Sequence, residues 1–187
     1  MKRTTGILVV GAFVLGGLVG TYALLPARTN QANLPVAVPH PVWHEVRWPF
    51  ALDQWGTGKA FQCKAADCGA EVNVYIRAKI GFCNCTTGVS DDEELDRISD
   101  FDLFGNRLAA QGPGRPIAVA WMKGRSRSFT IAGAPQTALS VGFNDHCDAI
   151  VATAVIERGE PATLEPAIIG FLNSQTVIRW AEVTLGL

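Results

Sequence analysis

EVNVYIRAKI, residues 71–80, is the stretch that decides the fold. Apolar and polar residues alternate along it, from the pair Glu71 and Val72 to the pair Lys79 and Ile80. Successive side chains of a strand point to opposite faces of a sheet, so this period of two predicts a strand with one buried face and one solvent-exposed face.

Further strands are predicted on either side of this stretch along the chain. Residues 116–122, PIAVAWM, are apolar on both faces, which favours a central strand. The next three residues, Lys123-Gly124-Arg125, predict a hairpin turn into a partner strand at 126–132. Four other segments have strand character: 138–143, 149–156, 42–48 and 59–63.

Helices are fewer and are concentrated at the C-terminus. Ser90 and Glu93 have the spacing of a capping box and predict a short helix over 91–99. Thr163 is the expected N-cap of a C-terminal helix with Pro166 in its first turn, and a second helical stretch should follow Ser174. Apolar residues recur in both at helical spacing: Leu164, Ile168, Phe171 and Leu172, then Val177, Trp180 and Ala181. We therefore predict an α+β domain, a mostly antiparallel sheet covered by a C-terminal helix.

The N-terminus carries a membrane signal. Lys2 and Arg3 precede an uncharged run at 6–25, which is long enough as a helix to span the hydrocarbon core of about 30 Å. The positive-inside rule then places the N-terminus in the cytoplasm and the rest of the chain in the periplasm. Residues 1–25 are thus predicted to be a signal anchor in a single-pass inner-membrane protein. The alternative is a signal peptide cut near Thr21-Tyr22-Ala23, which would leave a soluble periplasmic protein.

Composition divides the remainder into a tether and a domain. Residues 26–41 are rich in proline and are predicted to be an extended tether, and residues 42–187 fit a single exported domain. Removing Lys2 and Arg3 leaves 14 basic residues against 17 acidic ones, a formal charge of −3. A nucleic-acid partner is therefore not expected, because such proteins present a basic face.

Among the function classes considered, an enzyme has the least support in the sequence. The three histidines, His40, His44 and His146, have no catalytic spacing, and neither a zinc-protease helix nor a Gly-x-Ser-x-Gly elbow occurs. The acidic run at 91–94, continued by Asp96, Asp100 and Asp102, lacks the ligand spacing of a calcium loop. A solvated helix start explains that run better.

The cysteines are the most informative residues of the domain. There are five: Cys63, Cys68, Cys83, Cys85 and Cys147. In an exported chain they are candidates for disulfides, of which five cysteines allow at most two. Either Cys83 or Cys85 could join Cys147, and one thiol is left over. The alternative is that Cys83 and Cys85, together with Cys147 or His146, bind a soft ion such as Cu(I), because thiolates select that ion.

Residues 79–85, KIGFCNC, resemble the cysteine-x-cysteine segment of the membrane-anchored copper-delivery proteins that assemble cytochrome oxidase. The resemblance covers these seven residues and implies an N-in anchor, an exported β domain and Cu(I) as cargo. Cys63, Cys68, Cys147 and the helical C-terminus are not part of that family's pattern.

Three tryptophans close to prolines, Trp43, Trp48 and Trp55, are candidates for an exposed aromatic surface that binds a partner. The sequence as a whole predicts a membrane-tethered periplasmic binding or assembly-accessory domain with structural disulfides. Its expected partner is a protein of the cell envelope, and no cofactor is needed. The alternative is a Cu(I) metallochaperone-like protein that uses Cys83 and Cys85.

Overall fold

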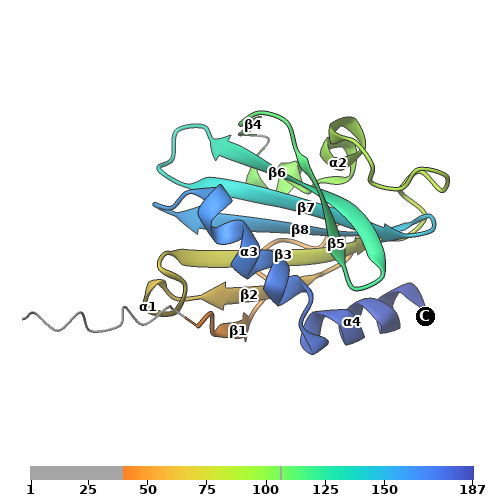
Figure 1. Cartoon of the computed structure of the whole chain (residues 1–187), viewed down its shortest axis with the longest axis horizontal. Helices are drawn as coiled ribbons and strands as arrows, with labels where there is room; N and C mark the ends of the chain where they lie inside the picture. Colours follow the sequence, from red (N-terminus) through yellow and green to blue (C-terminus); the bar gives the residue numbers. More distant parts are fainter. Residues whose placement is uncertain (1–39, 106) are drawn as a thin grey trace, which may run out of the picture. The chain divides into compact units, whose positions relative to one another are not determined.

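The structure is a computed structural model that describes residues 40–105 and 107–187. Its centre is an eight-stranded antiparallel sheet in the order β1-β2-β3-β8-β7-β6-β4, with β5 paired to β6 outside this path (Figure 1). The strands are β1 (Trp43–Val46), β2 (Lys59–Cys63), β3 (Glu71–Lys79), β4 (Leu108–Ala110), β5 (Arg115–Val119), β6 (Met122–Ile131), β7 (Thr137–Asp145) and β8 (Asp148–Glu157). The helical elements are α1 (Ala65–Cys68), α2 (Asp92–Ile98), η1 (Phe101–Phe104), α3 (Pro161–Leu172) and α4 (Gln175–Leu185). The predicted α+β class is confirmed.

The N-terminal predictions concern residues that the structure does not describe. The membrane segment, 1–25, and nearly all of the tether, 26–41, lie outside the described residues. Among the residues that are described, none of the helices is both long enough and apolar enough to cross a membrane. The topology and the location of the chain therefore stay predictions.

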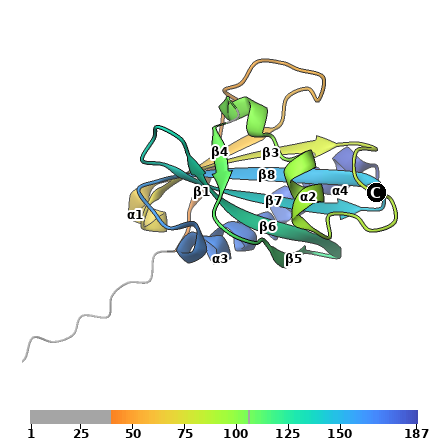
Figure 2. The same ribbon diagram turned by 90° about the horizontal axis from the view of Figure 1, so that it is seen from above.

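Strand β3 forms where the alternation predicts it, and it pairs with β8 along its whole length. Val72, Val74 and Ile76 are buried on one face. The prediction of a solvent-exposed second face holds at Glu71, which is exposed, but it is wrong at Arg77 and Lys79, which are 1% and 4% exposed. Figure 2 shows the reason: the segment after β1 and the short helical turn η1 lie on the side of the sheet opposite α3.

The two C-terminal helices cover the apolar face of the sheet. Leu164, Ile168, Leu172, Val177 and Ala181 are buried there in the main hydrophobic core, as the helical spacing predicts. Burial of each large side chain contributes about 1.5–3 kcal/mol.

The start of α3 differs from the prediction. The helix begins at Pro161 after the N-cap Glu160 rather than after Thr163, so Pro166 lies inside it. Proline fits the first helical position well because its missing N–H has no partner there in any helix. Pro166 leaves the carbonyl of Ala162 without a helical partner, and Ala162 is exposed to water that can supply one.

The β5–β6 hairpin also differs from the prediction. Val119 pairs with Met122, so Ala120 and Trp121 form the turn and Lys123 to Arg125 belong to β6. Asn173 fixes this turn, since its side chain accepts from the amide of Ala120 at 2.8 Å. Strand β5 lies at the sheet edge rather than at its centre, which suits Pro116 because proline cannot donate a ladder hydrogen bond.

Helix α2 packs on the second face of the sheet, above β7. A Cβ added at Gly142 would lie 2.9 Å from the side chains of Leu95 and Ile98, so glycine permits this close approach. The N-cap is Asp91, which accepts from the amide of Glu94 at 2.8 Å, and not the predicted Ser90. A carboxylate at this position also interacts favourably with the helix dipole.

Arginines of β6 hold α2 through its acidic residues. Arg125 donates to Asp92, and Arg127 donates to Asp96 at 2.7 Å. The hydrogen bond from Arg125 lowers the pKa of Asp92; partial burial acts in the opposite direction, and the amide of Gly114 adds to the lowering. The acidic run is therefore more than a solvated helix start, because Asp92, Asp96 and Asp100 all bind cations of the sheet.

Replacing Asp92 by asparagine tests this attachment. A carboxyl with a depressed folded-state pKa stabilises the fold above its unfolded value, about 3.9, and this contribution is lost as the pH falls through the folded pKa. Asp92→Asn should thus lower the free energy of unfolding by about 1 kcal/mol at neutral pH. Urea denaturation should be measured at neutral pH and near pH 2.5. The difference in the free energy of unfolding between variant and wild type should be smaller at the acidic pH. Asp91→Asn is the control, since asparagine caps a helix about as well as aspartate. An equal loss for Asp92→Asn at both pH values would contradict the ion-pair argument.

Candidate functional site

The cysteines form two disulfides, Cys63–Cys68 and Cys85–Cys147, and Cys83 remains free. The first closes a short loop around α1. The second spans 62 residues and joins the segment after β3 to the turn between β7 and β8. The expectation of disulfides in this domain is confirmed, and the leftover thiol is Cys83.

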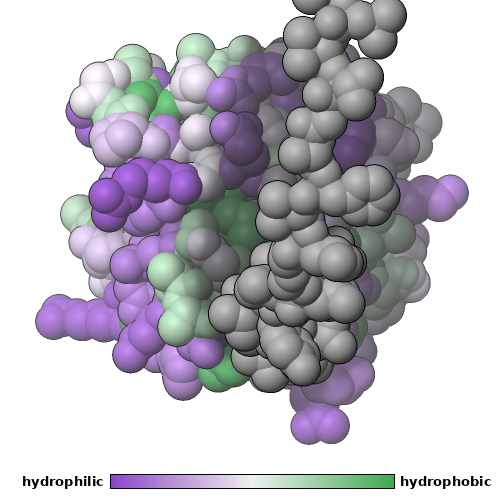
Figure 3. Space-filling model, turned by 60° about the vertical axis from the view of Figure 1, so that its left-hand side comes forward, coloured by the Kyte–Doolittle hydropathy of each residue, from purple (hydrophilic) through white to green (hydrophobic). Residues whose placement is uncertain are grey.

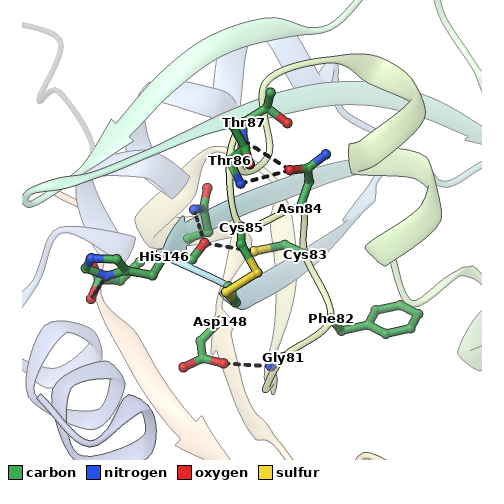
Figure 4. Close-up of a disulfide and its surroundings, with 12 residues drawn as sticks. Gly81, Phe82, Cys83, Asn84, Cys85, Thr86, Thr87, His146 and Asp148 are labelled. Carbon is green, nitrogen blue, oxygen red and sulfur yellow. Dashed lines mark hydrogen bonds and ion pairs between the residues drawn. A yellow bond between two sulfur atoms is a disulfide. The ribbon is translucent and has the colours of Figure 1, made fainter.

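The segment from Gly81 to Val89, called here the cysteine loop, is held at several points (Figure 4). At its ends, the amide of Gly81 donates to Asp148 at 2.6 Å and the amide of Val89 donates to Asn144 at 2.9 Å. In its middle, Asn84 accepts from the amides of the two threonines that follow Cys85, at 2.9 and 3.2 Å. The loop is thus fixed against the β7–β8 hairpin by polar contacts as well as by the disulfide.

The thiol of Cys83 lies within this loop and is 6% exposed. The sulfur of Cys83 is 3.3 Å from the carbonyl oxygen of His146, and the backbone amide of Cys83 donates to the carbonyl of Cys147 at 3.1 Å. Burial raises the pKa of the Cys83 thiol, and the carboxylates of Glu94 and Asp148 raise it further. Cys83 is therefore protonated at neutral pH, because each of these groups disfavours the thiolate.

The four candidate metal ligands, Cys83, Cys85, His146 and Cys147, come from the same end of the sheet. Cys85 and Cys147 are oxidised to a disulfide, and the side chain of His146 is 87% exposed and contacts Asp145 at 3.3 Å. In Figure 4 the imidazole points away from the sulfurs. Within residues 40–105 and 107–187, no group of three His, Cys, Asp or Glu residues is placed to hold a metal ion. Binding of Cu(I) by Cys83 and Cys85 would require the reduced protein.

A cluster of buried charges lies beside the cysteine loop, under the segment that follows β1. Arg77 donates to Asp100 at 3.1 Å through Nε and to Asp53 at 2.6 Å. Lys79 contacts the same Asp100 at 2.8 Å, and its ammonium group lies 5.1 Å from the ring centroid of Trp55. The buried cations Arg77 and Lys79 are thus neutralised by the buried Asp100 and by Asp53, whose side chain is 30% exposed.

This charge cluster is absent from the sequence predictions, although a signal exists. Arg77 and Lys79 have the alternate spacing of one strand face, and Asp92, Asp96 and Asp100 recur at every fourth residue. Of these carboxylates, Asp100 pairs with Arg77 and Lys79, whereas Asp92 and Asp96 pair with arginines of β6. The alternation alone could not show that the polar face is covered.

The structure does not bring the three candidate tryptophans onto one surface. Trp43 stacks on Phe171 of α3, with ring centroids 4.5 Å apart. Trp48 and Trp55 lie on the other face of the sheet, where they contact Arg77 and Lys79. All three side chains are half-buried, and each packs against the domain.

A groove of about 430 Å³ lies at the end of the second face, between the segment after β1 and η1. Its aromatic part consists of Phe50, Tyr75 and Phe104, with centroid distances of 4.9 Å for Phe50–Tyr75 and 5.4 Å for Phe50–Phe104. Burial raises the pKa of Tyr75, and Glu157 and Glu71 raise it further. The polar lining residues are Asn73, Arg107, Gln136 and Glu157. We call these seven residues and the space between them the aromatic groove.

The sequence predictions name none of the groove residues. They come from β3, β8, η1 and three connecting segments, and no spacing along the chain links them. The one signal is Tyr75, a large aromatic residue among the polar positions of residues 71–80.

Comparison with known proteins gives no match to a protein family, to a curated protein or to a solved structure. Function has to be inferred from the chemistry of the cysteine loop and the aromatic groove.

The two disulfides should differ in their contribution to stability. Closing a loop of 62 residues corresponds to about 4 kcal/mol of chain entropy, whereas the five-residue loop of Cys63–Cys68 corresponds to about 2 kcal/mol. Cys147→Ser should therefore lower the melting temperature of the oxidised protein more than Cys63→Ser does. Thermal melts of the two variants, compared with wild type in the same buffer, check the order. The reverse order of melting temperatures would show that the Cys85–Cys147 disulfide does not restrict the conformations of the unfolded chain more than the Cys63–Cys68 disulfide does.

Proposed function

We propose that this protein is a membrane-tethered periplasmic domain that binds a protein of the cell envelope, as an accessory or assembly factor. The observation that supports this most is the Cys85–Cys147 disulfide. A disulfide that joins distant parts of a fold forms and persists in oxidising compartments, and the charged and apolar pattern of residues 1–25 provides the export signal.

The surface of the domain suits a water-filled compartment. On the face drawn in Figure 3, hydrophilic residues are interspersed with several separate hydrophobic patches. Such a surface keeps a tethered domain soluble while leaving limited apolar sites for a partner.

The aromatic groove is the proposed partner site, and its chemistry fits an extended peptide segment. Its volume lies in the range of ligand sites in general, about 300–1,000 Å³. Asn73 accepts from Gln62 at 3.3 Å and Gln136 donates to Glu157, and each amide side chain keeps further donors and acceptors of the kind that a peptide backbone requires. Phe50 and Phe104 offer apolar contact to side chains, while Arg107 and Glu157 supply one charge of each sign.

Of the tryptophans predicted to bind a partner, Trp48 lies next to the groove. Its ring centroid is 5.3 Å from that of Phe50 and 6.2 Å from that of Tyr75. Trp43 and Trp55 lie elsewhere, so the proposed surface keeps Trp48 and replaces the other two by Phe50 and Phe104.

The proposed location has a direct test in intact bacterial spheroplasts. External protease should degrade the domain, and the full chain should remain in the membrane fraction after a carbonate wash, because an uncleaved apolar run at 6–25 anchors it. Recovery from the soluble periplasm of a protein lacking roughly the first 23 residues would show cleavage of a signal peptide. Protection from the protease would contradict export.

The proposed groove has a separate test by site-specific photocrosslinking in membranes. A crosslinker at position 107, on the groove, should capture one defined envelope protein. The same crosslinker at position 121 should not capture it, because this position lies at the β5–β6 turn and outside the groove. Trp121 is 49% exposed, so the position is accessible to a partner. Both positions are exposed, so neither change disturbs the core.

Capture from position 107 should also weaken in the variant Phe104→Ser, which removes apolar contact area. Its melting temperature is compared with wild type to separate lost binding from unfolding. Equal capture from positions 107 and 121, in a correctly exported protein, would reject the groove while leaving the proposed location intact.

A further inference from the structure

Three cysteines meet at the cysteine loop in three different states. Cys83 is a buried thiol, Cys85 is the exposed half of a disulfide, and Cys147 is the half-buried partner of Cys85. Figure 4 shows the sulfur of Cys83 drawn beside the disulfide. A free thiol next to a disulfide has the reactants of thiol–disulfide exchange.

The backbone aligns Cys83 with Cys147 and so makes Cys147 reachable from either cysteine. The amide of Cys83 donates to the carbonyl of Cys147 at 3.1 Å, and the Cys83 sulfur lies 3.3 Å from the carbonyl oxygen of His146, the residue before Cys147. The single backbone hydrogen bond brings the two backbones about as close together as neighbouring strands, which lie about 4.7–4.9 Å apart. Disulfides usually join Cα atoms about 4.4–6.8 Å apart.

We propose that Cys83, Cys85 and Cys147 form an exchangeable disulfide site, in which Cys83 can replace Cys85 as the partner of Cys147. The Cys83 thiolate attacks the sulfur of Cys147, the Cys83–Cys147 bond forms, and the Cys85–Cys147 bond breaks. Cys85 leaves as a thiolate and takes up the proton that Cys83 lost. One disulfide and one thiol are present before and after, so no oxidant or reductant is consumed.

The consequence of exchange is a change in which thiol reaches solvent. Cys83 is buried and Cys85 is exposed, so exchange moves the free thiol from the interior to the surface. A surface thiolate can attack a disulfide of another protein, forming a mixed disulfide through Cys85 and releasing one thiolate of that protein. The chemical class of the substrate is therefore a protein disulfide, and this activity is independent of the aromatic groove.

The surroundings of Cys83 keep the exchange slow at neutral pH. The attacking species is the thiolate, which burial and the carboxylates of Glu94 and Asp148 disfavour, whereas Arg97 favours it. Arg97 itself is held by Glu94, at 2.9 Å from its Nε. Exchange should become faster as the pH rises, because a larger fraction of Cys83 is then ionised.

The variant Cys85→Ser tests whether Cys83 can take over. The wild-type domain has one free thiol, and this variant should have none after oxidative folding, because Cys83 and Cys147 pair. Thiol titration of the unfolded protein and peptide mapping without reduction give the answer. Cys63→Ser is the matched control, and it should show two free thiols, Cys68 and Cys83. Two free thiols in Cys85→Ser would overturn the proposal.

A second measurement uses the wild-type protein and does not depend on the folding of a variant. N-ethylmaleimide, added without reductant at about pH 8.5, where the thiolate fraction of Cys83 is larger than at neutral pH, should label Cys85 and trap a Cys83–Cys147 disulfide. Cys83→Ser should show no label at Cys85, because the exchanging thiol is absent. Label at Cys83 alone, or no label at any cysteine in the folded wild type, would overturn the exchange.

Discussion

Arg77 and Lys79 are buried in β3, an interior strand of the sheet, and the rest of the second face is built around their charges. A cation removed from water needs a nearby carboxylate and hydrogen bonds to remain charged at acceptable free energy. Asp100 supplies both for the two cations, and Asp53 adds a second partner for Arg77. The segment after β1 and the turn after α2 therefore have to lie where these carboxylates reach β3.

The same constraint explains the position of α2. Its acidic residues Asp92 and Asp96 pair with Arg125 and Arg127 of β6, and Asp100, two residues beyond its last turn, reaches the cations of β3. Leu95 and Ile98 then pack on the sheet at Gly142. One short acidic segment thus spans several strands. Its ion pairs determine its orientation on the sheet, and its apolar contacts stabilise the packing.

The cysteine loop is attached to this charge cluster through Phe82. The ring of Phe82 lies 5.8 Å from the ammonium group of Lys79 and 4.7 Å from the guanidinium carbon of Arg97. Arg97 also donates to the carbonyl of Phe82 at 2.6 Å. The cysteine loop is therefore fixed by contacts with α2 as well as by the Cys85–Cys147 disulfide. Cys83 is enclosed between these two attachments.

The sequence by itself determined the α+β class, the strand at residues 71–80, the inward-facing residues of the C-terminal helices and the presence of disulfides. These depend on local periodicity and on residue chemistry, which the chain carries along its length. Only the tertiary structure decided that Arg77 and Lys79 are buried, that Cys83 is the free thiol and that Phe50, Tyr75 and Phe104 form a groove. Alternation shows that a strand has two faces but not what covers each face, and which cysteines pair depends on which turns meet in space.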